Sequence, residues 1–422
     1  MTFEHRNYMN KLYNKISVRV SRVARQLIPF NQKYKPIGVY RLSPSGSSNT
    51  TGGSGELMLH AIYPGLSTTL NISDDLFNAC SDYWKPVKHV ETNYEVAEVP
   101  QGRIHTDNET SVAIISKYNN LIGNVSLGLK DGKVIAAAEN PIFGQRYFKG
   151  PKKIKGTVFS LLTGGAGINN ISHWFIDVLP RLHLLRQSGL YDKIDWFLVP
   201  SLRYSYQTET LDMLGIPKEK LLAGDEHPHI TADCVVASTA PRGNHTLVPL
   251  WLCDYIKSAF IPLAQNGSAV ATPARIYISR SDSSMRNVIN EEELVEELKP
   301  LGFEHIISSK LSIREKLHLF ATAEVVVSAT GAGLVSILFC RPGTKVIEIF
   351  NEGFVIEPFY DIATKTDLDY DYIICPGTKK IKDAGKGQRE NLLVDIAKLK
   401  AKLGNRLQPV KVSSISKSEV DI

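Results

Sequence analysis

Apolar and polar positions alternate most regularly in the second half of the chain. Short runs rich in β-branched residues predict strands at 275–279, 303–307, 324–328, 344–350 and 370–374. Between these runs the apolar residues recur with the 3.6-residue period of a helix, at 290–301, 312–323, 333–340 and 356–364. Four strand–helix units followed by a last strand predict a parallel, doubly wound sheet.

The first half shows the same alternation less regularly. Residues 110–138 have the pattern of β-structure, with a hairpin signal at Asn119-Asn120. Further strands are predicted at 157–162, 195–200 and 233–238, and helices near 207–215 and 248–262. The breaker-rich stretch 264–273 is taken as a domain boundary. We therefore predict an α/β protein with a tail over 1–36, domains over 57–263 and 274–375, and a helix and tail over 376–422.

The tail over residues 1–36 is strongly basic. It holds eight Lys or Arg and one Glu, whereas the whole chain of 422 residues has a net charge of only +6. Between residues 8 and 28 the apolar side chains fall on one helical face and most basic ones opposite. This pattern is typical of a helix that binds an anionic membrane surface, and also of a helix docked on its own protein.

The rest of the chain is nearly neutral, which argues against a basic groove for nucleic acid. No apolar run reaches the roughly 20 residues of a membrane span, and no secretory signal is visible. We expect a cytoplasmic protein, peripheral on the inner face of the cell membrane if the tail binds lipid.

A glycine-rich stretch that enters a helix, "GGAGINNISHWFIDVLPRLHLL" (164–185), is the first candidate for chemistry. Asn170 or Ser172 is expected to cap the helix. Gly165 and its neighbouring glycines would let backbone approach a ligand closely. Pro180 removes a helical N–H and is expected to kink the helix, which would tilt its first turns into a cleft.

On this helix His173, Asp177 and Arg181 follow one another at intervals of four residues, and so share a face. Asp177 can accept a hydrogen bond from one imidazole nitrogen and leave the other to take a proton from a substrate. Asp177 as the base itself is the nearest variant. A buried His–Asp pair with only a structural role is the alternative.

The loop after the strand at 275–279 contains Arg280 and Arg286, and Asn290 can cap the helix that follows. Two guanidinium groups at a strand end suit a diphosphate, because each binds phosphate oxygens in bidentate fashion. Solvated surface arginines are the alternative interpretation.

The apolar strand at 324–328 ends in Thr330, Gly331, Ala332 and Gly333, which open a helix. Free N–H groups at such a start attract anions, and glycines let a phosphate come close. The stretch is neither a G-x-G-x-x-G nor a Walker A motif. Glu348 lies in the next buried strand and needs a partner there; ribose hydroxyls or an arginine would serve. The acids of "DLDYD" (367–371) are explained by strand alternation, so no metal is expected.

These segments together resemble the family 61 glycosyltransferases. The resemblance covers roughly residues 95–375 and is carried in order by "NNISHWFIDVLPRLHLL", "ISRSDSSMRNVINEEEL", "GFEHI", "FATAEVVVSATGAGLVSILF" and "PGTKVIEIF". It implies a GT-B fold, in which two Rossmann-like domains face each other across a cleft. It also implies inverting transfer from a nucleotide sugar, commonly a UDP-sugar, to an acceptor glycan in surface polysaccharide synthesis. No metal cofactor is expected, because the arginines and the helix start would take its role, and the basic tail suggests that the glycan is lipid-linked.

The resemblance assigns roles to the two candidate regions. The carboxyl-terminal domain would bind the donor through Arg280, Arg286, Asn290, Glu348 and residues 330–333. The amino-terminal domain would supply the base, with Gly165, Asn170 and Arg181 on the acceptor side. The family usually has His where this chain has Thr330, and Asn or His where it has Ser336. A catalytically inactive glycan- or nucleotide-binding homologue is therefore the alternative function, and a dinucleotide-dependent oxidoreductase or epimerase is a rival.

Overall fold

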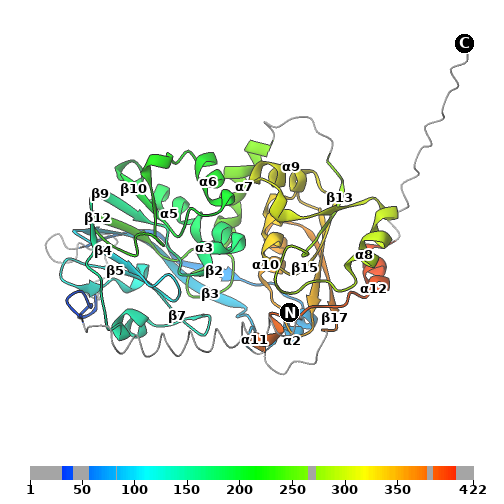
Figure 1. Cartoon of the computed structure of the whole chain (residues 1–422), viewed down its shortest axis with the longest axis horizontal. Coiled ribbons are helices and arrows are strands. Elements are labelled where there is room, and N and C mark those ends of the chain that lie inside the picture. Colours follow the sequence, from blue (N-terminus) through cyan, green and yellow to red (C-terminus); the bar gives the residue numbers. More distant parts are fainter. Residues whose placement is uncertain (1–30, 41–56, 82, 265–271, 378–383, 405–422) are drawn as a thin grey trace, which may run out of the picture.

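Two β-sheets with helices packed on them lie side by side along the long axis of the molecule (Figure 1). The computed structural model describes residues 31–40, 57–81, 83–264, 272–377 and 384–404. The predicted α/β class is therefore confirmed. The predicted basic helix over residues 8–28 lies outside the described residues. None of the described helices is long and apolar enough to cross a bilayer.

The second sheet is the predicted doubly wound one. Five parallel strands run in the order β14-β13-β15-β16-β17 within the described residues. The strands are β13 (Arg275–Ile278), β14 (Phe303–Ile306), β15 (Val325–Ala329), β16 (Lys345–Asn351) and β17 (Asp369–Cys375). The helices between them are α8 (Glu291–Leu298), α9 (Ile313–Thr322), η9 (Ala332–Phe339) and α10 (Pro358–Lys365). Each predicted element is present, because each satisfies its own period locally.

The helix after β15 differs from the prediction in its winding. η9 is a 3-10 helix, and the Leu334 N–H donates to the Gly331 carbonyl at 3.0 Å. Its eight residues connect two neighbouring strands while Leu334–Phe339 stay buried. A 3-10 helix rises about 2.0 Å per residue instead of about 1.5 Å, so it spans the same distance with fewer residues.

The first sheet is mixed, and twelve strands of the described chain contribute to it. Its parallel part, β12-β9-β10-β11, contains the three strands predicted around 157–238. The strands of the first sheet are β1 (Gly38–Val39), β2 (Met58–Thr69), β3 (His89–Pro100), β4 (Arg103–Thr106), β5 (Ser111–Ile115), β6 (Asn120–Leu121), β7 (Leu127–Lys130), β8 (Lys133–Val134), β9 (Lys152–Ser160), β10 (Trp196–Val199), β11 (Leu221–Ala223) and β12 (His229–Ser238). The Rossmann-like domain that the resemblance implies for the first half therefore corresponds only to the parallel part of this sheet, β12-β9-β10-β11.

The long antiparallel ribbon β2–β3 was not predicted from the sequence. Pro64-Gly65 lies within β2, although these two residues, judged from the sequence alone, indicate a turn. The structure keeps the strand continuous through two register shifts in its pairing with β3. Pairing with a partner strand has therefore overridden the local turn signal.

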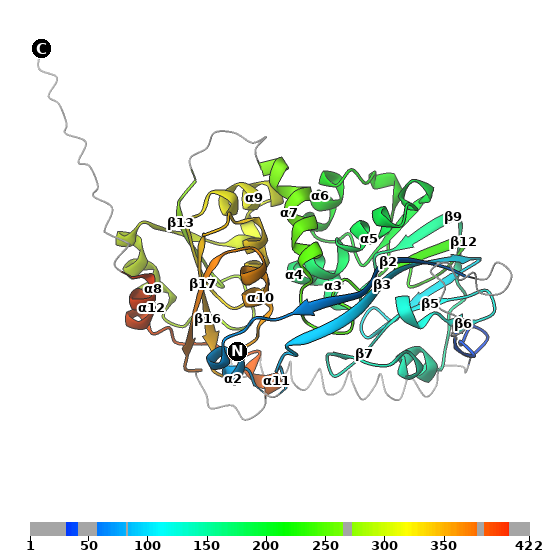
Figure 2. The same ribbon diagram turned by 180° about the vertical axis from the view of Figure 1, so that it is seen from behind.

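Between β2 and β3 the chain leaves the first sheet. It forms α2 (Asp74–Ala79), which lies beneath the ends of β16 and β17 (Figure 2). Leu76 and Cys80 share a buried cluster there with Phe350 and Val355. Part of the predicted domain 57–263 therefore packs against the other sheet.

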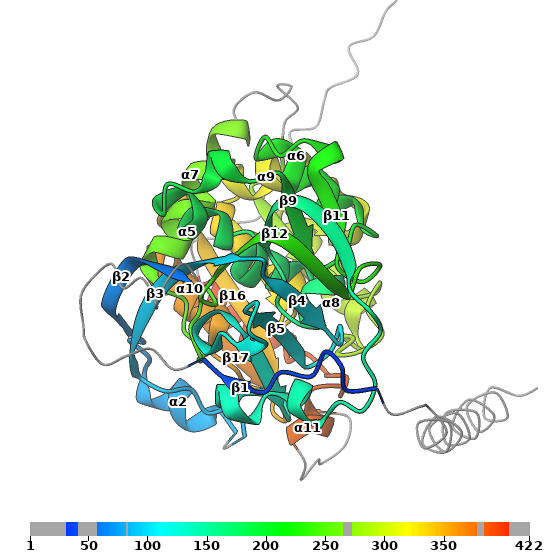
Figure 3. The same cartoon turned by 90° about the vertical axis from the view of Figure 1, so that its left-hand side faces the viewer.

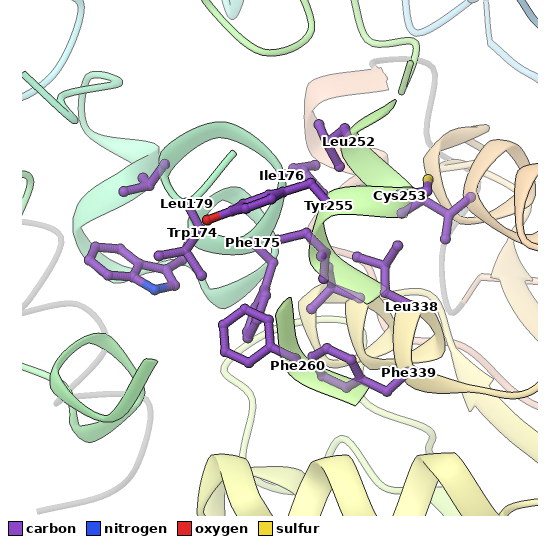
Figure 4. Close-up of a cluster of buried hydrophobic side chains, with 14 of the residues drawn as sticks. Trp174, Phe175, Ile176, Leu179, Leu252, Cys253, Tyr255, Phe260, Leu338 and Phe339 are labelled. Atoms are coloured by element: carbon purple, nitrogen blue, oxygen red, sulfur yellow. The ribbon is translucent and has the colours of Figure 1, made fainter. Parts of the chain in front are cut away.

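Helices of both halves meet in one continuous core. α5 (Arg181–Gln187) covers β3 and β12 of the first sheet (Figure 3). Phe175, Phe260 of α7 (Leu250–Ala264) and Phe339 of η9 pack edge-on or tilted, with ring centroids 5.4–6.1 Å apart (Figure 4). Burial of such rings is worth about 2–3 kcal/mol each, so this contact holds the two halves together. The remaining helices are α3 (Ala166–Asn169), α4 (Ile171–His173), α6 (Ser205–Met213), α11 (Ala384–Gly387) and α12 (Ile396–Leu403).

Short 3-10 turns complete the described chain. They are η1 (Gly123–Val125), η2 (Ala137–Glu139), η3 (Pro141–Gly144), η5 (Tyr191–Lys193), η6 (Lys218–Lys220), η7 (Lys299–Leu301) and η8 (Ser308–Lys310). The residues of chemical interest lie instead at the carboxyl ends of the parallel strands.

Candidate active site

The first candidate region follows the carboxyl end of β9. Asn170 caps α4 as predicted, because its side-chain oxygen accepts from the N–H groups of Ser172 at 2.9 Å and His173 at 3.3 Å. The glycine before this helix is needed because its backbone packs closely against the loop at Asn108 and Glu109. The Gly165 N–H donates to the Glu109 carbonyl at 3.0 Å, and a Cβ on Gly165 would lie 2.9 Å from the Asn108 carbonyl oxygen. The close approach is thus made by the chain's own loop.

The helix passes through a π-helical turn before Pro180. In η4 (Trp174–Val178) the Leu179 N–H donates to the Trp174 carbonyl, five residues back, at 3.0 Å. The helix then resumes as α5 directly after Pro180. The predicted disturbance therefore takes the form of a widened turn. Such turns are rare and are frequent at functional sites.

The predicted contact between His173 and Asp177 is present. His173 Nδ1 lies 2.6 Å from Asp177 Oδ2. The side chain of His173 is 35% exposed and that of Asp177 is 15% exposed. No described residue bonds to His173 Nε2, so this nitrogen is available to a substrate. His173 and Asp177 are called the dyad below.

Arg242 completes the dyad, and sequence reasoning missed it. Its Nε donates to Asp177 Oδ1 at 2.8 Å and its Nη2 donates to Asp177 Oδ2 at 2.9 Å. Arg242 follows β12, which pairs in parallel with β9 so that Ala237 lies opposite Ser160. The carboxyl ends of both strands therefore meet at one edge of the sheet. A basic residue just after a second buried strand is the signal that could have revealed it.

These partners determine the charge of Asp177. Burial alone would raise the pKa of this carboxyl group. The Arg242 guanidinium and the hydrogen bond from His173 outweigh burial and hold the pKa well below its usual range. Asp177 is therefore a carboxylate at any ordinary pH. Because both oxygens are already bonded, it is better suited to orient His173 than to accept a proton itself.

Arg181 does not join the dyad as a third side-chain partner. Its Nε donates to the backbone carbonyl of Asp177 at 3.1 Å, and its Nη1 donates to the carbonyl of Ser238 at 2.8 Å. The guanidinium is buried and ties the helix to the end of β12. Burial lowers the pKa of Arg181 to about 10, although the Asp177 charge opposes this shift. The expected shared face of three side chains is thus replaced by a backbone tether.

The second region gathers at the ends of β13 and β15. Arg280 Nη2 donates to Ser283 Oγ at 2.7 Å and to the Met285 carbonyl at 2.9 Å, which shapes the loop. Arg286 Nε donates to the Thr330 carbonyl at 3.2 Å. The Arg280 guanidinium lies directly against Gly331, where any Cβ would overlap it. The structure therefore brings both predicted arginines to the start of η9.

Both guanidinium groups are short of negative partners. Neither forms an ion pair with a described residue. Burial lowers the pKa of Arg280, and burial followed by the charge of Arg280 lowers the pKa of Arg286 to about 10. Adjacent cations, the buried Arg280 and the half-buried Arg286, favour an anion beside the N–H groups at the start of η9.

Asn290 precedes α8 as predicted but does not cap it. Its side-chain oxygen accepts from the Val394 N–H at 2.9 Å, and its side-chain nitrogen donates to the Val394 carbonyl at 3.0 Å. The amide therefore holds the carboxyl-terminal segment against the sheet. The helix start is instead rich in acid side chains, which the helix dipole favours.

Glu348 is fully buried and has a tyrosine as its partner. The Tyr370 hydroxyl donates to Glu348 Oε2 at 2.7 Å. Thr330 lies near enough to lower the pKa, although neither its hydroxyl nor Glu348 Oε1 completes a hydrogen bond of good geometry. Burial dominates and raises the pKa of Glu348 to about 7. The bonded partner among the described residues is thus a tyrosine and not the arginine considered from the sequence, and a ribose hydroxyl at Oε1 stays a prediction.

The two regions are neighbours. α4, which carries His173, packs against η9, which begins next to Arg280 and Gly331. Within the part of the chain that the structure describes, no group of three or more His, Cys, Asp or Glu side chains is placed to hold a metal ion.

Residues 171–347 match the family model described as Glycosyltransferase 61. No curated protein matches the sequence. The solved structures that match include the dodecameric iron-containing heptosyltransferase TibC in complex with ADP-D-beta-D-heptose, at 12% identity and a TM-score of 0.27, with 61% of this chain and 75% of that chain covered. A second is the same glycosyltransferase from enterotoxigenic E. coli H10407, at 12% identity and a TM-score of 0.26, with 61% and 77% covered. Likenesses this low support no argument about the site.

Proposed function

We propose that this chain, which matches the glycosyltransferase 61 family model over residues 171–347, is an inverting enzyme that moves a sugar from a UDP-sugar to an acceptor glycan. The carrying observation is the packing of α4 against η9. α4 ends at the histidine of a His–Asp pair, and η9 begins beside Arg280 and Arg286, neither of which forms an ion pair with a described residue. A proton acceptor and an anion site at one place are what such a transfer requires.

In this scheme His173 is the base. Its Nε2 takes the proton of the acceptor hydroxyl while Nδ1 stays bonded to Asp177. The acceptor oxygen forms a bond to the anomeric carbon as the bond from that carbon to the diphosphate oxygen breaks. The bonding pair leaves with the diphosphate, and in-line attack inverts the anomeric configuration.

The leaving diphosphate is assigned to the second region. Arg280, Arg286 and the N–H groups of Gly331–Gly333 supply positive charge where negative charge develops. Glu348 Oε1 is the atom proposed to accept from a ribose hydroxyl, since Oε2 is already bonded to Tyr370. The scheme needs no metal ion, because these groups carry the charge that a metal would otherwise neutralise.

The acceptor is proposed to be a glycan or lipid-linked glycan of surface polysaccharide synthesis, reached over Gly165 and Asn170, whereas the buried Arg181 takes no part in its binding. A membrane contact through residues 8–28 would bring the enzyme to a lipid-linked acceptor. Co-sedimentation of the full chain with anionic and neutral vesicles tests that contact. Equal binding to both kinds of vesicle would argue against it.

Calorimetric titration with UDP, GDP, CMP and NAD, with and without EDTA, tests the donor site. We expect UDP to bind in the presence of EDTA and Arg280→Ala to weaken that binding. Binding of NAD alone would favour the oxidoreductase rival instead. A sugar screen with the preferred nucleotide then follows, and NMR of the product reports the anomeric configuration. Nucleotide binding without transfer to any acceptor would favour the inactive homologue.

A further inference from the structure

We propose that Arg242 is the positioning residue of the dyad, and that the carboxyl-terminal half of the molecule delivers it through a loop fastened to α10. This inference rests on the proposed function, because it assigns a role within the same reaction. Arg242 would act on the base indirectly, because its hydrogen bonds go to Asp177, which in turn holds His173.

The first argument is the geometry at Asp177. Arg242 bonds to both carboxylate oxygens, at 2.8 and 2.9 Å, and so fixes the rotation of the carboxylate plane. One of the two oxygens, Oδ2, also holds His173 Nδ1 at 2.6 Å. With that plane fixed, the imidazole ring has one favoured orientation. A lysine has no planar fork and could not hold both oxygens in this way.

The second argument is how the loop over residues 239–249 is held. The Val248 N–H donates to Asp361 Oδ2 at 2.7 Å, and Lys365 Nζ donates to the Val248 carbonyl at 2.6 Å. Asp361 and Lys365 also pair with each other across one turn of α10, at 2.7 Å. The second half of the molecule therefore forms hydrogen bonds with both the N–H and the carbonyl of Val248. The Tyr94 hydroxyl bonds to the Pro241 carbonyl at 3.1 Å and steadies the other side.

The third argument is the charge around the guanidinium. Arg242 is 13% exposed and lies between Asp177 of the first half and the buried acids Glu357 and Asp361 of the second. Asp177 faces His173, Arg242 and, through its backbone, Arg181. Glu357 directly precedes α10, and Asp361 lies within it. This helix follows β16, the strand that carries Glu348. The same β16–α10 unit therefore reaches both the donor region and the dyad.

A purely structural ion pair would make a different prediction from a positioning residue. Loss of a structural pair lowers stability and leaves the rate of the folded enzyme unchanged. Loss of a positioning residue lowers kcat while nucleotide affinity stays the same, since Arg242 lies outside the donor region. It also moves the acid limb of the pH–rate profile to higher pH, because a positive charge that opposes protonation of the dyad is gone.

The experiment compares full-length wild type with Arg242→Gln and Arg242→Lys, below the unfolding temperature of each. We expect kcat to fall about 10²-fold in Arg242→Gln, with the Kd for UDP within a factor of three of wild type. Arg242→Lys should recover stability but little of kcat. The acid limb should shift upward in Arg242→Gln and lie close to wild type in Arg242→Lys.

A second variant tests the fastening of the loop and covers the case in which Arg242→Gln does not fold. Lys365→Met removes the bond to the Val248 carbonyl from a side chain that is 15% exposed. We expect kcat to fall about 10-fold with UDP affinity unchanged. Lys345→Met is the matched control, since it breaks a Lys–Asp pair, with Asp369 at 3.4 Å, that does not include a residue of the loop. Its kcat should equal that of wild type.

The outcomes separate the two proposals. If wild type transfers sugar and the folded Arg242 and Lys365 variants keep its kcat and pH profile, Arg242 is only structural and the inference is overturned. If wild type transfers no sugar from any donor that it binds, the proposed function fails, and the inference fails with it.

Discussion

Asp177, with a side chain 15% exposed, and the fully buried Glu348 are carboxyl groups of the two candidate regions, yet their pKa values move in opposite directions. Asp177 is held by Arg242 at 2.8 and 2.9 Å and by His173 at 2.6 Å, and its pKa lies well below its usual range. Glu348 has a neutral tyrosine at 2.7 Å as its bonded partner, and burial raises its pKa to about 7.

The difference shows that burial alone does not determine the charge of a carboxyl group. A bidentate guanidinium supplies more stabilisation than desolvation removes, whereas a hydroxyl does not. Asp177 therefore remains charged and can orient a base. Glu348 has a pKa near neutral pH, and the positive charge of Arg286 is close enough to interact with it. The predictions below test this contrast from the largest effect to the smallest.

Replacing His173 with Ala should have the largest effect. We expect kcat to fall by about 10²–10⁴-fold, because the acceptor hydroxyl loses its base. The affinity for UDP should stay within a factor of three, since the donor region is untouched. Initial rates and calorimetry measure the two quantities. His89→Ala, at the exposed start of β3, is the matched control. Unchanged turnover in His173→Ala would remove this residue from the mechanism.

Replacing Glu348 with Gln should change how stability depends on pH. A carboxyl group with a raised pKa in the folded state destabilises that state as pH rises from 4.5 to about 7. Gln carries no charge, so the variant should lose this decline and be more stable above pH 7, by on the order of 3 kcal/mol. Denaturant unfolding at pH 5 and pH 8 measures it. A parallel decline in both proteins would show that Glu348 does not titrate there.

Replacing Asp177 with Asn should change the pH dependence of stability in the opposite direction. Its depressed pKa contributes stability that is present above the ordinary range of an aspartate and is lost as pH falls. In Asp177→Asn the acid limb of the stability curve should therefore flatten. At pH 7 the variant should lose about 3 kcal/mol, because Arg242 is left buried without its partner. The same unfolding series, extended to pH 3, measures both effects, and a steeper acid limb would contradict the assignment.

Replacing Arg280 with Ala tests the donor region. We expect the Kd for UDP to rise about 10- to 100-fold, which corresponds to one or two charge-assisted hydrogen bonds. Arg314→Ala, on the exposed face of α9, is the control and should leave the Kd unchanged. A loss of affinity in both variants would indicate a general charge effect, which would also weaken in high salt.

Replacing Tyr370 with Phe should have the smallest effect. Glu348 loses a neutral hydrogen bond worth about 1 kcal/mol, and its charged form becomes less favourable. The decline of stability should therefore start at the same pH as in wild type, which the unfolded state determines, but continue to a higher pH, because the pKa of Glu348 in the folded state is raised further. Unfolding curves at closely spaced pH values resolve this shift. If the pH at which the decline ends does not move, Tyr370 has no influence on the carboxyl group.

Local patterns in the sequence determined much of this protein. The strands and helices of the second sheet follow from their own periods, and the parallel order follows from their alternation. The dyad was also predictable, because residues four apart on a helix must meet. The cap at Asn170 and the arginines around Gly331 belong to the same class of short-range or strand-end signal.

Only the tertiary structure decided the rest, because the contacts involved join distant parts of the chain. Arg242 reaches Asp177 because β9 pairs with β12. Two side chains of α10 form hydrogen bonds with Val248, which lies more than a hundred residues earlier in the sequence. The strand β2 persists across Pro64-Gly65 only because β3 pairs with it. A sequence specifies which residues favour an element, but the sign of a buried group's pKa depends on which distant partner the fold places beside it.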